Sequence, residues 1–230
     1  MAVLWRDTPG DFHYEIQIFA VPNVKIELKP LDPVVEKTSL RIIGGDMRSR
    51  KLQFTVDPRT RPMKDRTREA VMNLMGGTFD DSIAFDLFAG TGVLGFEALS
   101  RGATRAVLFD ILAHGVLEIR KNCEALGIKD RVIVLQKDVI RWSESLEQNL
   151  AFLRLEDMPW IVFCCPPYAL WESQGESLRS MLEMWIEKSP VRSLFAVELE
   201  DKTPLELLPN CLEWDVRVYK PARMAIAEKV

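Results

Sequence analysis

The chain alternates strands and helices along most of its length, and this alternation restricts its possible folds more than any other feature. From Ser82 onward, apolar runs of strand length are separated by longer segments with helical periodicity. The expected strands cover 83–88, 106–109, 132–135, 160–165 and 194–198, and the expected helices cover about 92–100, 113–126, 143–153 and 173–188. Such alternation predicts an α/β fold with a doubly wound, mostly parallel sheet covered by helices on both faces.

The two ends of the chain depart from this alternation. The last two apolar runs, 214–219 and 222–228, are joined only by Lys220 and Pro221. A parallel crossover needs about a dozen residues or more, so we expect an antiparallel hairpin at the edge of the sheet. The first 40 residues contain two alternating runs that could form a β-hairpin. The expected domains are an N-terminal extension (1–40), a basic segment (41–78) and the main α/β domain (79–230).

Composition excludes several classes of protein. The 230 residues are 47% hydrophobic, which suits one substantial core with a small appendage. No apolar run approaches the roughly 20 residues that cross a bilayer, and the first ten residues lack the pattern of a secretory signal. We therefore expect a cytoplasmic monomer without a membrane partner. The four cysteines and two histidines show neither disulfide nor metal-ligand spacing, so no metal site is predicted.

Charge is distributed unevenly. The net charge of −4 argues against indiscriminate coating of nucleic acid. Residues 41–68 nevertheless contain nine basic and three acidic side chains, so this segment carries +6 and the rest of the chain carries −10.

A glycine-rich loop follows the first strand of the α/β region. The segment 86–95, DLFAGTGVLG, has glycines at 90, 92 and 95 between an expected strand and an expected helix. Glycines allow a tight turn and close approach of a ligand, and the helix directs its free N–H groups at that ligand. A ligand-free turn is the alternative, although the context favours a ligand. The candidate cofactor-binding residues are Asp86, Phe88, Ala89, Gly90, Thr91, Gly92, Asp110 and Asp138.

The carboxylates around this loop favour S-adenosylmethionine over a dinucleotide. Asp110 follows the loop by about 20 residues, where an acid binds ribose hydroxyls in either case. Asp86 could reach the amino group of S-adenosylmethionine, whereas it would repel a pyrophosphate. Asp138, after the third strand, could accept from an adenine amino group, or it could simply cap a helix.

A proline elbow follows the fourth strand. Cys165, Pro166, Pro167 and Tyr168 are the candidate catalytic residues. Prolines fix φ and lack N–H groups, so nearby carbonyls can be held toward the ligand crevice, while Tyr168 offers a flat face for a base. This arrangement suits a clamp for a planar amine, although two prolines can also simply end a strand. Cys164 should face the other side of the strand and serve packing.

These motifs together resemble a known family. A glycine loop with x-Pro-Pro-Tyr after the fourth strand looks like the amino-methyltransferases, which usually have Asp, Asn or Ser before the prolines. The segments 41–52 (RIIGGDMRSRKL), 61–69 (RPMKDRTRE) and 86–102 (DLFAGTGVLGFEALSRG) resemble the RsmD family. Members of that family are bacterial enzymes that methylate the N2 amino group of a guanine in small-subunit (16S) rRNA. The similarity runs from about residue 41 to the C-terminus.

The resemblance implies a Rossmann-like class I methyltransferase fold and S-adenosylmethionine as donor. It also implies that the basic segment holds small-subunit rRNA or an assembling subunit, in agreement with the local charge. The expected RNA-binding residues are Arg41, Arg48, Arg50, Lys51, Arg61, Arg66 and Arg68, and a solvated basic face is the alternative for any one of them. The protein would mainly orient the attacking nitrogen and stabilise charge.

Cys165 departs from the family pattern, because a thiol is a weak hydrogen-bond acceptor and donor. Three explanations stay open at this point. The Pro166 carbonyl and Tyr168 suffice at a lower rate, a thiolate substitutes, or the chain is an RNA-binding assembly factor with weak or no activity. Amino-methyltransferases acting on DNA or protein use a related elbow and form a further alternative. A working RNA methyltransferase is the favoured interpretation.

Overall fold

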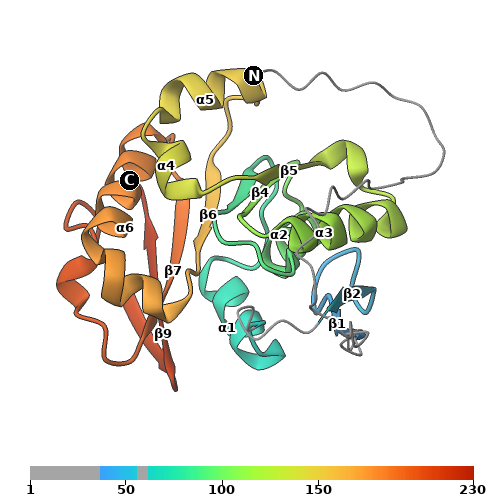
Figure 1. Ribbon diagram of the computed structural model, residues 1–230, viewed down its shortest axis with the longest axis horizontal. Helices are drawn as coiled ribbons and strands as arrows, with labels where there is room; N and C mark the ends of the chain where they lie inside the picture. The colour runs from blue at the N-terminus through green and yellow to red at the C-terminus, as the bar shows by residue number, and fades with distance from the viewer. Residues whose placement is uncertain (1–36, 56–61) are drawn as a thin grey trace, which may run out of the picture. The chain divides into compact units, whose positions relative to one another are not determined.

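A seven-stranded sheet forms the centre of the molecule (Figure 1). The computed structural model describes residues 37–55 and 62–230, so the possible hairpin before residue 30 and Arg61 lie outside the described residues. The strands are β3 (Ile83–Asp86), β4 (Arg105–Asp110), β5 (Val132–Gln136), β6 (Trp160–Cys164), β7 (Leu194–Glu200), β8 (Asp215–Tyr219) and β9 (Ala222–Glu228).

The strand order is β5-β4-β3-β6-β7-β9-β8. Strands β3 to β7 pair in parallel, and β9 pairs antiparallel with both β7 and β8. The predicted mostly parallel sheet with an antiparallel C-terminal hairpin is therefore confirmed. Within the hairpin, β8 forms the edge and β9 lies inside the sheet.

The direction of strand addition reverses between β3 and β6. From β3 the chain adds β4 and then β5 on one side, and it returns to place β6 on the other side of β3. In open α/β sheets, ligands bind at such a switch point, outside the carboxyl ends of the strands. The glycine loop after β3 and the proline elbow after β6 both follow these ends.

Helices cover both faces of the sheet. They are α1 (Asp65–Leu74), α2 (Val93–Ser100), α3 (Ala113–Leu126), α4 (Val139–Ser143), α5 (Leu146–Leu153) and α6 (Tyr168–Lys188). One apolar cluster joins α1, α2 and α3 to the sheet, and a second one joins α4, α5 and α6 to it. Within the described residues, no helix has both the length and the apolar character that a membrane crossing requires.

Two helix boundaries differ from the expectation. The single helix expected over 143–153 is two helices, α4 and α5, and α4 begins earlier because Asp138 caps its first turn. Helix α6 begins at Tyr168 rather than at 173, with Pro167 as its N-cap and a non-helical residue at Gln174. The fixed φ of a proline suits entry into a helix, so the elbow itself starts α6.

The segment 41–78 belongs to the same core as the rest of the domain. Strands β1 (Lys37–Arg41) and β2 (Lys51–Thr55) form an antiparallel hairpin. The boundary expected after residue 40 falls inside β1, one residue before its end. The boundary expected at 78 does not separate two cores, because Ile42, Leu52 and Val71 share one cluster with α2 and α3.

Close packing holds the turn of this hairpin on the end of α2. The backbone N–H of Asp46 donates to the Ser100 carbonyl at 2.7 Å. Gly45 has a φ of +73°, and a Cβ there would lie 1.6 Å from the same carbonyl oxygen. Only glycine fits this position. The hairpin also contacts α3, where the Asn122 side chain pairs with both backbone groups of Gln53 at 2.8 and 2.9 Å.

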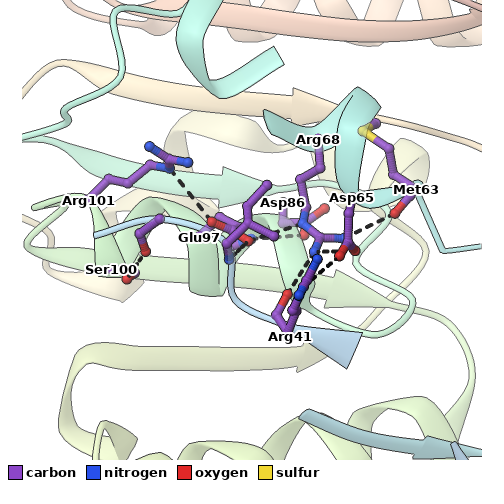
Figure 2. Close-up of polar contacts among 11 residues, drawn as sticks. Arg41, Met63, Asp65, Arg68, Asp86, Glu97, Ser100 and Arg101 are labelled. Carbon is purple, nitrogen blue, oxygen red and sulfur yellow. Dashed lines mark hydrogen bonds and ion pairs between the residues drawn. The ribbon is translucent and has the colours of Figure 1, made fainter. Parts of the chain in front are cut away.

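A buried ion pair joins α1 to α2 (Figure 2). Arg68 is fully buried, and its Nε donates to Oε1 of Glu97, also fully buried, at 3.0 Å. The guanidinium further donates to the carbonyls of Met63 and Arg41 and to the carboxylate of Asp65. The RNA-binding role expected for Arg68 is therefore wrong, because its charge is already neutralised inside the protein.

We expect Arg68→Ala to lower the free energy of unfolding by about 3–5 kcal/mol, because it leaves the buried carboxylate of Glu97 without its main partner. Urea unfolding followed by circular dichroism measures this change. Arg66→Ala is the matched control, since Arg66 is exposed on the same helix and its removal should change stability by less than about 0.5 kcal/mol. Equal stability of the two variants would contradict the structural role of Arg68.

Candidate active site

Two carboxylates and a thiol lie on one face of the sheet near its carboxyl-terminal edge. Successive side chains of a strand alternate between faces. Ala84 of β3, Phe163 of β6 and Ala196 of β7 belong to the cluster under α1, α2 and α3. Each of these residues is followed two positions later by Asp86, Cys165 or Glu198, respectively. The three side chains therefore lie on the same face of the sheet. Because β3, β6 and β7 are neighbours, the three side chains follow one another across the switch point.

Asp86 is a buried acid of this face with a raised pKa. Its side chain is buried, with 1% exposure, and Oδ2 accepts from the backbone N–H of Gly95 at 3.3 Å. Oδ1 has no hydrogen-bond partner among the described residues. Burial raises the pKa of Asp86 to about 7, with a smaller lowering from the Gly95 N–H and a smaller raising from the charge of Asp110. A buried carboxylate oxygen without a partner beside a glycine loop fits a cationic amino group of a ligand.

The glycine loop has a backbone shape that requires glycine. Gly90 and Gly92 have φ values of +52° and +76°, in the left-handed region that other residues rarely adopt. A Cβ on Gly92 would lie 3.0 Å from side-chain atoms of Leu108 and Phe96. Asp110 fixes the loop from the end of β4, because its carboxylate accepts from the N–H of Gly90 at 2.8 Å. The loop is thus fixed at the start of α2.

The other predicted cofactor residues lie in or near this loop. Ala89 and Thr91 are buried and Phe88 is partly buried. Asp138, in contrast, caps α4: its Oδ1 accepts from the N–H groups of Ile140 at 3.0 Å and Arg141 at 3.4 Å. Of the two roles considered for Asp138, helix capping is the one that its observed contacts show.

The proline elbow joins β6 directly to α6. Pro166 is buried, Pro167 is exposed, and the Tyr168 hydroxyl donates to Oε1 of Glu198 at 2.8 Å. Burial, followed by the charges of Glu198 and Asp86, raises the pKa of the Cys165 thiol well above its usual value. The Cys165 thiol of the ligand-free protein is therefore mainly neutral at physiological pH, which argues against the thiolate explanation.

The neighbouring Cys164 belongs to the opposite face of the sheet. It is fully buried in the apolar cluster under α4, α5 and α6. The packing role predicted from strand alternation is confirmed.

The remaining basic residues lie on the hairpin β1–β2 and on α1. Arg48, Arg50, Lys51 and Arg66 are exposed. Arg41 is 66% exposed, and its Nε donates to the Asp65 carboxylate at 2.8 Å. These five side chains are accessible to a polyanion, unlike Arg68.

Glu198 is a site residue that the sequence motifs did not indicate. It interrupts the apolar run of β7 between Val197 and Leu199, both of which are fully buried. An acid inside such a run is rare unless it is paired or functional. An acidic residue within this apolar run was therefore the sequence feature that could have pointed to Glu198.

The comparisons with known proteins agree with this arrangement. A family model described as "Conserved hypothetical protein 95" matches residues 40–223. The chain belongs to the RsmD family of rRNA methyltransferases. It is 30% identical to the ribosomal RNA small subunit methyltransferase D of Buchnera aphidicola from Acyrthosiphon pisum, over 76% of this chain and 85% of the relative. The methyltransferase D of Haemophilus influenzae is 31% identical, over 77% and 88%.

A solved structure shows the same fold. The Escherichia coli methyltransferase yhhF superposes with a TM-score of 0.63 at 27% identity, covering 84% of this chain and 98% of that one. The predicted Rossmann-like methyltransferase fold is therefore confirmed, and the dinucleotide oxidoreductase alternative finds no support. The chain is a methyltransferase enzyme of this family.

We expect the raised pKa of Asp86 to appear in the stability of the ligand-free protein. The folded protein keeps the proton up to about pH 7, whereas the unfolded chain loses it near pH 3.8. Stability should therefore fall as the pH rises from about 4 to about 7, by an amount of the order of 4 kcal/mol at about 1.4 kcal/mol for each pKa unit.

The free energy of unfolding in urea, measured across this pH range, tests the expectation. Asp86→Asn should remove most of the slope, whereas Asp130→Asn, which removes an exposed carboxyl, should retain it. A wild-type slope that survives in Asp86→Asn would contradict the assignment.

Proposed function

We propose that the enzyme methylates the exocyclic N2 amino group of a guanine in small-subunit rRNA, with S-adenosylmethionine as methyl donor. One observation carries the proposal. A glycine loop with an orphaned buried carboxylate oxygen and a proline elbow with an aromatic ring lie at one switch point of the sheet. The relatives' names, ribosomal RNA small subunit methyltransferase D, support the choice of substrate.

The residues present fit the cofactor. Asp86 would bind its cationic amino group through the carboxylate oxygen that has no partner in the described part of the chain. The loop at Gly90 and Gly92 would let the ligand approach the backbone, and Asp110 would bind ribose hydroxyls at the end of β4. Asp138, after β5, would accept from the adenine amino group while it caps α4. When bound, this cofactor supplies an electrophilic methyl group.

The proline elbow would orient the target base. The Pro166 carbonyl would accept a hydrogen bond from the amino group, and the Tyr168 ring would stack on the purine. A nitrogen held in line with the methyl group needs little further activation, because orientation alone removes a large part of the barrier. Cys165 itself, a neutral thiol, would add little as an acceptor.

The basic residues on β1–β2 and α1 would hold the RNA backbone. Arg41, Arg48, Arg50, Lys51 and Arg66 are exposed in the structure, and Arg61 is included by its place in the same segment. Contacts from such side chains to phosphates position a strand, while the pocket selects the base. The partner would be free small-subunit rRNA or an assembling subunit, bound by a monomer.

The reaction is tested by methyl transfer from labelled S-adenosylmethionine to small ribosomal subunits purified from cells that lack this gene. We expect one N2-methylguanine per subunit by mass spectrometry of RNA digests, and no label in DNA or protein. Subunits from cells with the gene are the control, since their site is already methylated. A different result would support the assembly-factor alternative. In that case the wild type would bind the cofactor but transfer no methyl group to any ribosomal substrate, and Cys165→Asp would restore the transfer.

The salt dependence of RNA binding tests the basic surface. Removing one side chain that neutralises a phosphate should reduce the slope of log K against log salt by roughly 0.7 to 0.9. The double change Arg48→Ala and Arg50→Ala should therefore weaken binding and flatten the slope by about 1.5. Arg217→Ala, on the edge strand β8, is the control and should retain the wild-type slope. A double variant with an unchanged slope would exclude these two residues from the interface.

A further inference from the structure

A carboxylate lies beside the thiol that occupies the acceptor position of the elbow. In the parallel pairing of β6 with β7, Cys164 is the partner of Val197. The next residues along the two segments, Cys165 and Glu198, are therefore neighbours. After burial, the charge of the Glu198 carboxylate is the largest cause that raises the pKa of the Cys165 thiol, which agrees with this proximity. The structure thus places a strong acceptor next to a weak one.

Residues of the elbow hold Glu198 in place. Oε1 of its carboxylate accepts from the Tyr168 hydroxyl at 2.8 Å. Its backbone carbonyl accepts from the Trp171 indole N–H at 2.9 Å, one turn further along α6. On its other side, β7 pairs with β9, where the partner of Glu198 is the fully buried Met224. A carboxylate oriented by the Tyr168 hydroxyl on a strand that is paired on both sides can present a fixed acceptor to a ligand.

We propose that Glu198 is the hydrogen-bond and proton acceptor for the target amino group, a role that Cys165 is too weak to fill. This inference rests on the proposed function. In the reaction, the target nitrogen forms its bond to the methyl carbon while the carbon–sulfur bond breaks and its electron pair goes to sulfur. The proton that the nitrogen must lose passes to the Glu198 carboxylate and then to water. A carboxylate has about four acceptor positions, so it can bind the amino group while Tyr168 orients it.

The hydrogen bond to Tyr168 does not by itself require a carboxylate at this position. Holding the Tyr168 hydroxyl requires only an acceptor, and a neutral glutamine would provide one. Placing a carboxylate between the buried Val197 and Leu199 costs free energy. The charge itself is useful when positive charge develops on the attacking nitrogen, because a carboxylate stabilises it. Glu198→Gln therefore separates the two roles.

The experiment compares methyl transfer at saturating concentrations of small subunits and S-adenosylmethionine. We expect Glu198→Gln to lower kcat about 100-fold, while the Kd for S-adenosylmethionine and the melting temperature stay near wild type. Glu198→Asp should retain more activity than Glu198→Gln, because it keeps the charge. Glu200→Gln is the matched control on the same strand and the same face, and it should have wild-type kcat.

A second substitution, Cys165→Asp, gives a more specific test of the proposed role. Cys165→Asp should raise the kcat of Glu198→Gln at least tenfold, because it returns a carboxylate to the elbow. In the wild-type background the same change should give no gain, since two adjacent carboxylates repel each other and one becomes protonated.

Distinct outcomes overturn the inference and the proposed function. Transfer by the wild type together with undiminished kcat in Glu198→Gln overturns the inference alone. The inference alone is also overturned if Glu198→Gln is as active as Glu198→Asp, or if Cys165→Asp fails to raise the kcat of Glu198→Gln. If Glu198→Gln does not fold, Glu198→Asp decides in its place. Its carboxylate is drawn back by one methylene and should accept the proton less well, so a kcat equal to that of the wild type would overturn the inference. Absence of transfer by the wild type overturns the proposed function and this inference with it.

Discussion

The buried ion pair between Arg68 and Glu97 is the interaction on which the rest of the structure depends. Helix α2 is buried along its whole length, so the charge of Glu97 must be compensated inside the protein. Arg68 provides that compensation from α1, and the N–H of Ile43 adds a hydrogen bond at 2.7 Å. The same carboxylate thus ties α1, the β1–β2 hairpin and α2 together. Since α2 begins at the glycine loop, the elements that carry the basic residues and the proposed cofactor site are joined through α2.

Burial also sets the chemistry at the switch point. It raises the pKa of both Asp86 and Cys165. A mainly neutral thiol and an acid that titrates near neutrality limit the negative charge that Cys165 and Asp86 add to this part of the sheet in the absence of a ligand. A cationic ligand at Asp86 would favour the ionised form. If Asp86 binds the cofactor as proposed, binding would be linked to the loss of a proton from Asp86.

Local motifs allowed much of the fold and of the site to be predicted. The strand and helix alternation, the glycine loop and the elbow at Cys165 are each encoded within a few residues, and the structure places them as expected. Arg68 was misassigned because a local count of charges does not register Glu97, which lies 29 residues further on. Glu198 was missed because its relation to Cys165 arises only when β6 and β7 pair. The early start of α6 followed from Pro167, whose helix-starting role competes with its strand-ending role.

The position of β9 inside the sheet has a consequence for synthesis. Strand β9 follows every other described strand in the chain, so the ribosome makes it after them, yet it supplies the partner for both β7 and β8. Until it emerges, β7 presents an open apolar edge, which is prone to pairing with other chains. Pairing at this edge of β7 can therefore be completed only after synthesis has passed β9.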